Sequence, residues 1–411
     1  MNPKQFLFPN LKNIEKSVFY LQDGTYTNRS ILGVGIKEHL SINQAKKTVF
    51  QSIDNFNKKE GWKIILFGYD LKNAIEELSS SNKDHLEFPE LFMVIPEMVF
   101  SIEKGKVIAL SGNEHPDYYN TKQTITSSLE PPNQEIKHIL KPRVPKREYL
   151  RNLEFIQDHL QRGDIYEVNY CVEFFKENAS INPFETYRKL HNITKAPHSA
   201  YVQWGSFSLL CASPERFISR NRNRLISQPI KGTKRRGATR EEDDHLIENL
   251  RNDPKERSEN IMITDLVRND MSKISTKGSV NVTDLCRINT FETVHQMIST
   301  IQCEVRPEVA FSDIFKSLFP MGSMTGAPKV SAMQIIEKLE TSKRGMYSGA
   351  VGYIDPYGNF DFNVVIRSLM YNAEKRYLSA MVGGAITIAS DPEMEYEECL
   401  LKAEALFQAL Q

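Results

Sequence analysis

The stretch DPKERSENIMITDLVRND, residues 253–270, carries the clearest structural signals in the chain. Asp253 and Pro254 suit the N-cap and the first position of a helix, and Glu256 completes a capping box ahead of an apolar stripe. The stretch DPEMEYEECLLKA, residues 391–403, begins with the same Asp-Pro pair. We therefore predict a long helix in the middle of the chain and another at its end.

Around these helices, short apolar runs alternate with amphipathic segments. Residues 62–70, 91–100 and 107–112 predict buried strands, whereas the spacing in 149–163 predicts a helix that ends at a glycine. Residues 201–213 and the pair RFISR and RLISQPI that follows predict an antiparallel meander. This mixture indicates an α+β fold with large, mixed, mainly antiparallel β-sheet layers flanked by helices.

Two shifts in composition divide the chain. Residues 127–147 contain four prolines, which is typical of a connector. We therefore expect a variable N-terminal part over residues 1–145 and a part that carries the chemistry over residues 146–411, intertwined as one unit. The densely charged residues 233–245 predict a mobile, solvated loop.

The charge balance constrains the partners. Lys plus Arg and Asp plus Glu each number 52, which argues against a nucleic acid or a membrane surface as partner and favours a small substrate. The five cysteines show no C-x-x-C spacing, so neither a disulfide framework nor a zinc site is indicated. No signal peptide or membrane-spanning run is apparent, and we expect a cytoplasmic protein.

Carboxylates on the two predicted helices form the first candidate site. Glu256 and Glu259 are three residues apart, and Glu395, Glu398 and Lys402 share one face of the C-terminal helix. Mg²⁺ takes oxygen ligands from one or two carboxylates, water and the substrate's own anion. The two helices could bind Mg²⁺ if they face each other, although each pair alone is more typical of a helix cap or a solvated surface.

Other single residues are candidates for acid, base or nucleophile. Lys231, in PIKGT, lies between an apolar strand end and a glycine turn, where partial burial would lower its pKa and give a neutral, nucleophilic amine, the alternative being an ordinary exposed lysine. Glu215 could be a general acid if desolvated, the alternative being a pair with Arg216 or solvent. His295 and Arg367 stand alone in apolar surroundings, where such residues are more often structural than ligand contacts.

Two glycine-rich stretches could approach a ligand closely. GSMTGAPK, residues 322–329, lacks the Gly-Lys-Ser/Thr of a Walker A loop, but its backbone N–H groups and small hydroxyl residues such as Thr325 could bind a carboxylate. A plain structural turn explains it equally well. GGAI, residues 383–386, is a second candidate for close backbone approach.

From about residue 163 to the C-terminus, the chain resembles the chorismate-binding enzyme family, which includes the anthranilate, aminodeoxychorismate, isochorismate and salicylate synthases. The matching stretches occur in family order: GDIYEVNY (163–170), SPERF (213–217), PIKGTKRRG (229–237), RSENIMITDLVRND (257–270), FPMGSMTGAPK (319–329), YSGAVGYIDPYGNFDFNVVIRS (347–368) and EYEECLLKA (395–403). The resemblance implies the fold of anthranilate synthase component I.

The resemblance also implies roles for residues. Glu259 and Glu398 match direct Mg²⁺ ligands, and Glu256 and Glu395 match carboxylates that act through water. His295 matches an active-site histidine. A further set matches the family's substrate-binding positions, with chorismate as the substrate: Tyr347, Arg367 and Gly383 for the enolpyruvyl carboxylate, Lys402 near the ring carboxylate, and Thr325 in the glycine-rich loop.

Lys231 distinguishes between members of the family. PIKGT resembles the members that aminate chorismate at C4, whereas the anthranilate-forming members, which aminate C2, usually carry a small residue there. The resemblance implies that the neutral lysine adds at C2 while Glu215 protonates the leaving C4 hydroxyl, and that ammonia from a glutamine amidotransferase subunit then attacks C4. A C2-aminating enzyme and a catalytically silent relative that only binds the amidotransferase are the alternatives. The chain departs from the family pattern at Glu167, usually glutamine, and at Met321, which interrupts a double glycine.

Overall fold

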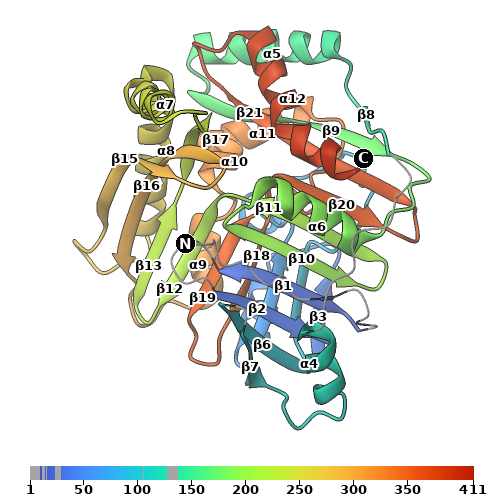
Figure 1. Cartoon of the computed structure of the whole chain (residues 1–411). Helices are drawn as coiled ribbons and strands as arrows, with labels where there is room; N and C mark the ends of the chain where they lie inside the picture. Colours follow the sequence, from blue (N-terminus) through green and yellow to red (C-terminus); the bar gives the residue numbers. More distant parts are fainter. Residues whose placement is uncertain (1–9, 12–13, 15, 24–28, 105, 127–137) are drawn as a thin grey trace.

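Two large antiparallel sheets form the centre of the molecule, which is described by a computed structural model (Figure 1). The structure describes residues 10–11, 14, 16–23, 29–104, 106–126 and 138–411. The first sheet has eleven strands, in the order β17 (Gly326–Ala327), β9 (Glu167–Lys176), β21 (Tyr377–Ile386), β20 (Ser368–Asn372), β11 (Phe207–Ser213), β10 (His198–Trp204), β1 (Val18–Asp23), β2 (Arg29–Val34), β6 (Met98–Glu103) and β7 (Lys106–Ser111), with β8 (Lys141–Pro142) beside β9.

The second sheet has ten strands and is again antiparallel. Its order is β14 (Ile230–Arg235), β16 (Val294–Glu304), β13 (Arg224–Gln228), β12 (Arg216–Asn221), β19 (Phe360–Val364), β18 (Ala350–Ile354), β4 (Lys63–Phe67), β5 (Leu91–Ile95) and β3 (Glu38–Ile42), with β15 (Asn281–Thr290) paired to β16. Strands from before and after residue 145 occur in both sheets, so the two parts of the chain share one core.

The helices cover the outer faces of the sheets. The helices α5 (Lys146–Arg162), α6 (Pro183–Thr194), α11 (Lys329–Leu339) and α12 (Pro392–Ala409) pack on the first sheet, and Figure 1 shows α5 and α12 above it. The remaining helices are α2 (Val49–Asn57), α3 (Lys72–Ile75), α4 (Tyr118–Thr126), α7 (Arg240–Asn252), α8 (Pro254–Ser272), α9 (Phe311–Leu318) and α10 (Gly322–Thr325). No helix in the described part of the chain is both long and apolar enough to cross a membrane.

Apolar side chains fill two layers. Phe67, Phe92 and Phe362 belong to a cluster on both faces of the second sheet: Phe92 stacks on Trp204 of the first sheet, and Phe67 and Phe362 pack against Phe315 of α9. Tyr149 and Leu406 belong to a cluster between the first sheet and its helices. Fully burying such side chains contributes roughly 1.5–3 kcal/mol each. These apolar layers fix the positions of the strands and helices whose ends carry the candidate site residues.

The capping signals correctly predicted both long helices. The Asp253 carboxylate accepts hydrogen bonds from the backbone N–H groups of Lys255 and Glu256, both at 3.1 Å, at the start of α8. Asp391 caps α12 by accepting from the N–H of Met394 at 2.9 Å. The predicted helix over 149–163 is α5, which ends at Gly163 in the left-handed conformation. The strands expected in 62–70 and 107–112 are β4 and β7.

Two expectations about local structure were wrong. Residues 91–100 form β5 and β6 rather than one strand, because the chain turns at Pro96, which cannot donate to a ladder. Residues 233–245 are not a loop: β14 runs to Arg235, and α7 begins at Arg240 with Thr239 as its N-cap. The acidic side chains that suggested a solvated loop stabilise the first turn of α7. Of the predicted connector, residues 127–137 lie outside the described residues.

Candidate active site

A cavity of about 520 Å³ lies between the two sheets, and residues of α8 and α12 complete its lining. This volume lies in the usual range for a small-molecule site. Strands β9 and β21 supply one wall, and β14 and β16 supply another. The residues predicted for the site that line this cavity are Glu215, Lys231, Glu256, Glu259, Tyr347, Arg367, Gly383, Glu398 and Lys402.

Lys231 reaches the cavity from an irregular point of β14. The pairing of β14 with β16 shifts register between Ile230 and Thr233, and Gly232 has a φ of 81°, in the left-handed region. A bulge with a glycine in this conformation changes the direction of the neighbouring side chain. The Lys231 ammonium lies 2.8 Å from Oε1 of Glu167 and 3.8 Å from Oε2 of Glu259.

The expectation of a lowered pKa for Lys231 was wrong. Burial alone would lower this pKa, but the charges of Glu167 and Glu259 and the hydrogen bond to Glu167 outweigh burial and raise it well above its ordinary value. The sequence shows the lysine's position but not the carboxylates that are buried with it. Lys231 is therefore an ammonium when the cavity holds no substrate.

Carboxylates from α8 and α12 come together at one side of the cavity. The Lys255 ammonium bridges the two helices, 2.8 Å from Oε1 of Glu395 and 4.0 Å from Oε1 of Glu259. Glu398 pairs with Lys402 on α12 at 2.7 Å. Burial, opposed by the charge of Lys231, raises the pKa of Glu259 to about 7. The helices thus concentrate negative charge that the lysines only partly balance.

This donor set fits a hard cation. Among the described residues, no three His, Cys, Asp or Glu side chains form a complete metal site by themselves. Mg²⁺ needs only one or two carboxylates when water and substrate supply the other oxygens. Oε1 of Glu259 and Oε2 of Glu395 are buried without a hydrogen-bond partner among the described residues, and such oxygens have an uncompensated desolvation cost. Glu395 lies just behind the cavity wall, with Oε2 about 3.1 Å from the position of a Cβ on Gly384.

Glu215 has the properties of a proton donor. It lies in the turn between β11 and β12, is 5% exposed, and accepts a hydrogen bond from the Ser323 hydroxyl at 2.9 Å. Burial raises the pKa of Glu215 to about 7, although the Ser323 hydrogen bond and the charge of Lys231 oppose this shift. The carboxyl can therefore hold a proton near neutral pH.

A third group of residues can bind a carboxylate. Arg367 lines the cavity without an ion-pair partner among the described residues, and burial lowers its pKa. Tyr347 is buried and lines the same cavity. At Gly383, a Cβ would lie 2.5 Å from the Cys171 sulfur, so only glycine fits. The Lys402 ammonium donates to the Gly383 carbonyl at 2.9 Å. The Arg367 guanidinium can donate two parallel hydrogen bonds to a carboxylate, and Gly383, which has no side chain, leaves room for that carboxylate beside the backbone.

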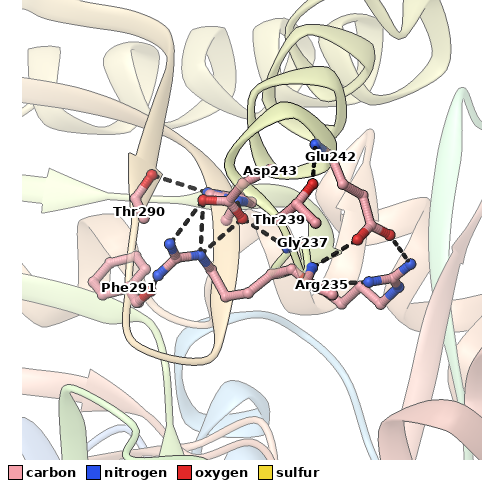
Figure 2. Close-up of polar contacts among 10 residues, drawn as sticks. Arg235, Gly237, Thr239, Glu242, Asp243, Thr290 and Phe291 are labelled. Atoms are coloured by element: carbon pink, nitrogen blue, oxygen red, sulfur yellow. Dashed lines mark hydrogen bonds and ion pairs between the residues drawn. The ribbon is translucent and has the colours of Figure 1, made fainter.

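Besides Glu395, two predicted residues lie outside the cavity lining. His295 is fully buried in β16. Its Nε2 lies 2.8 Å from Asp243 and its Nδ1 lies 2.9 Å from the Thr290 hydroxyl, two residues that are labelled in Figure 2. Thr325 is fully buried and donates to the Met321 carbonyl at 3.0 Å. Both side chains are occupied by the protein itself.

Sequence reasoning missed Lys255 and Gln296 and did not assign a contact to Glu167. Lys255 precedes Glu259 by four residues, so helical spacing could have placed it beside the carboxylates. Gln296 lines the cavity next to His295 on β16, where the alternation of a strand turns neighbouring side chains to opposite faces. The contact of Glu167 with Lys231 joins residues 64 positions apart, and no local pattern signals it.

The chorismate binding enzyme family matches residues 16–408, and the chain belongs to this family. Relatives within it carry different names. The chain is 41% identical over 263 residues to the probable aminodeoxychorismate synthase of Oryza sativa, an alignment that covers 63% of this chain but only 29% of that protein. It is 30% identical over 370 residues to aminodeoxychorismate synthase component 1 of Bacillus subtilis, covering 86% of this chain and 77% of the relative.

Anthranilate synthases are similar as well. Component 1 from Acetivibrio thermocellus is 33% identical over 387 residues, covering 88% of this chain and 77% of that protein. The crystal structure of anthranilate synthase component I from Streptococcus pneumoniae superposes with a TM-score of 0.80 at 24% identity, covering 94% of this chain and 93% of that chain. This superposition confirms the expected α+β fold.

Proposed function

We propose that the chain converts chorismate and ammonia to 4-amino-4-deoxychorismate, for p-aminobenzoate and folate synthesis in the cytoplasm. A glutamine amidotransferase subunit would supply the ammonia. The observation that carries this proposal is the Lys231 ammonium inside the cavity, 3.8 Å from Glu259 and close to the proton-donating Glu215. An enzyme that only lets ammonia attack the ring directly has no need of a buried amine at this point.

The residues have separable tasks in this proposal. Arg367, Tyr347 and the Gly383 backbone would hold the enolpyruvyl carboxylate, and Lys402 would attract the ring carboxylate. Glu259 and Glu398 would hold Mg²⁺, with Glu256 and Glu395 acting through water. When bound, Mg²⁺ would neutralise the ring carboxylate and favour departure of the C4 hydroxyl.

Covalent catalysis would begin with a proton transfer. Lys231 must lose a proton before it attacks, and the contacting carboxylate of Glu167 is positioned to accept it. The amine then bonds to C2 as the two conjugated ring double bonds shift and the C4–O bond breaks, and Glu215 gives its proton to the departing hydroxyl, which leaves as water. Ammonia attacks C4, the two double bonds shift back, and the C2–N bond breaks, so that the lysine leaves as a neutral amine and the new C4 substituent is an ammonium group.

The second candidate is anthranilate formation, which the similarity to anthranilate synthases favours. Mass spectrometry of the product from chorismate, Mg²⁺ and ammonium at mildly alkaline pH, followed by lyase treatment, separates the two. We expect p-aminobenzoate after the lyase step. Anthranilate as the main product would reject amination at C4, and no aminated product would favour a silent relative.

A further inference from the structure

The helix α7 is attached to the molecule at two points. Among its thirteen residues, all of them described, Leu250 is the one that is buried, where it packs with Cys286 and Met297. At the other end, the first turn is held by polar contacts of Asp243 and by the contacts of Glu242 with Arg235 and with the N–H of Ala238 (Figure 2). Few buried apolar contacts characterise elements that open at low free energy. The polar contacts therefore decide whether the first half of α7 stays in place.

Asp243 is the centre of these contacts. Its carboxylate accepts hydrogen bonds from Nη2 of Arg236 at 2.7 Å, from the N–H of Gly237 at 2.7 Å and from Nε2 of His295 at 2.8 Å. His295 also contacts the Thr290 hydroxyl on β15. A Cβ on Gly237 would lie 2.3 Å from the Asp243 nitrogen, so only glycine allows this close approach. One carboxylate thus joins the end of β14, α7 and β16.

The strand β14 needs such a support. It is the last strand of its sheet, and beyond the register shift its ladder with β16 consists of three pairs, from Thr233 to Arg235. Lys234 pairs with His295 in that ladder. Edge strands are paired along one side only. Without the Asp243 contacts, the side-chain link between β14 and the first turn of α7 is reduced to the pair of Arg235 with Glu242, so this short ladder and the bulge that directs Lys231 can open more readily.

The far end of α7 acts on the same bulge. A Cβ on Gly232 would lie 2.9 Å from Leu250 and 3.1 Å from the Glu256 carboxylate. Side chains of α7 and of the first turn of α8 therefore pack closely against Gly232, the residue after Lys231. Asp253 ends α7 and caps α8. The helix therefore connects the strand that carries Lys231 directly to the helix that carries Glu259.

We propose that Asp243 and His295 are positioning residues whose contact holds β14 against β16 and thereby keeps Lys231 opposite Glu167 and Glu259. His295 acts through Asp243 and not on the substrate. The effect on turnover rests on the proposed function, whereas the effect on β14 does not. A displacement of about 1 Å at a reacting group can reduce a rate about a hundredfold, so a loosened strand is sufficient to impair the enzyme.

The test compares Asp243→Asn with Asp244→Asn, which removes the same charge from a neighbouring exposed residue whose ion-pair contact is with Arg240 at 4.0 Å. Backbone hydrogen exchange at Thr233, Lys234 and Arg235 in the free protein should accelerate in Asp243→Asn and not in Asp244→Asn. With chorismate, Mg²⁺ and ammonium, we expect kcat about tenfold lower in Asp243→Asn, with KM and melting temperature close to the control.

A second comparison uses two substitutions of His295. His295→Gln keeps a side-chain N–H that can donate to Asp243, so kcat should stay near that of the wild type, whereas His295→Ala should resemble Asp243→Asn. A Gln variant as impaired as the Ala variant would show that the imidazole takes part in the chemistry and would overturn the proposal. Unchanged exchange in Asp243→Asn would overturn it as well.

If Asp243→Asn does not fold, Arg236→Ala takes its place. This variant removes the ion pair between Arg236, at the end of β14, and Asp243, and it alters a residue that is partly exposed. Unchanged exchange in Arg236→Ala then rejects the proposal. A wild-type protein that does not aminate chorismate would reject the proposed function, and the exchange measurements would still decide whether Asp243 holds β14.

Discussion

Lys231 and Glu167 form a buried ion pair, with 2.8 Å between Nζ and Oε1, and the glutamate is fully shielded from solvent. The second carboxylate oxygen of Glu167 has no hydrogen-bond partner among the described residues. The resemblance to the family had indicated glutamine at this position. The carboxylate of this chain therefore fixes the charge of the lysine on which the proposed chemistry depends.

Carboxylates of α8 and α12 should determine the metal requirement. Because Glu398→Gln removes a proposed ligand charge, the Mg²⁺ concentration for half-maximal activity should rise by about tenfold to a hundredfold. A Mg²⁺ titration of activity measures this. Glu397→Gln, on the exposed face of the same helix, is the control. Normal activity of Glu398→Gln at low Mg²⁺ would remove this residue from the ligand set.

The protonated form of Glu215 should limit activity at alkaline pH. Since its pKa is raised to about 7 and the acid form is needed, the kcat contribution of Glu215 is present below pH 7 and is lost as the pH rises through that value. The Ser323 hydrogen bond lowers this pKa, so Ser323→Ala should move the alkaline limb of the kcat profile to higher pH. A limb that moves to lower pH would contradict the role of this hydrogen bond.

Arg367 should contribute to substrate affinity. A planar guanidinium bonds both oxygens of a carboxylate, which an ammonium does not reproduce. Arg367→Lys should therefore raise KM for chorismate by about tenfold or more, the equivalent of about 1.5–3 kcal/mol for a hydrogen bond to a charged group. Steady-state kinetics with ammonium as the nitrogen donor provide the value. An unchanged KM would place the carboxylate elsewhere in the cavity.

Arg344 and Glu340 should matter for stability. The guanidinium is 1% exposed, pairs with Glu340 at 2.6 Å and donates to the carbonyls of Asn169 and Met324. Glu340→Gln leaves that cation without its counter-ion, which should lower the free energy of unfolding by about 3–5 kcal/mol. Urea unfolding measures the loss in Glu340→Gln against a control, Asp313→Asn. The control breaks the exposed ion pair with Lys316 and should lower the free energy of unfolding by at most about 1 kcal/mol. Equal losses in the two variants would show that the buried pair of Arg344 with Glu340 contributes no more to stability than an exposed pair.

The sequence predicted those features of the fold that depend on local signals. Asp253 and Asp391 cap helices wherever the chain places them, and the spacing of Glu256 and Glu259 sets their common face. Features that arise from contacts between distant residues were not predictable. The pKa of Lys231 depends on Glu167, and the partner of His295 Nε2 is Asp243, which is 52 residues away. Residues 233–245 were misjudged because their charges pair within the protein.

The proposed reaction requires a covalent bond between the Lys231 amine and the substrate ring. Intact-protein mass spectrometry after incubation with chorismate and Mg²⁺, with ammonia left out, tests it most directly. We expect a substrate-derived mass increase that peptide mapping assigns to Lys231 and that disappears in Lys231→Ala. An adduct formed in equal yield by Lys231→Ala would contradict it.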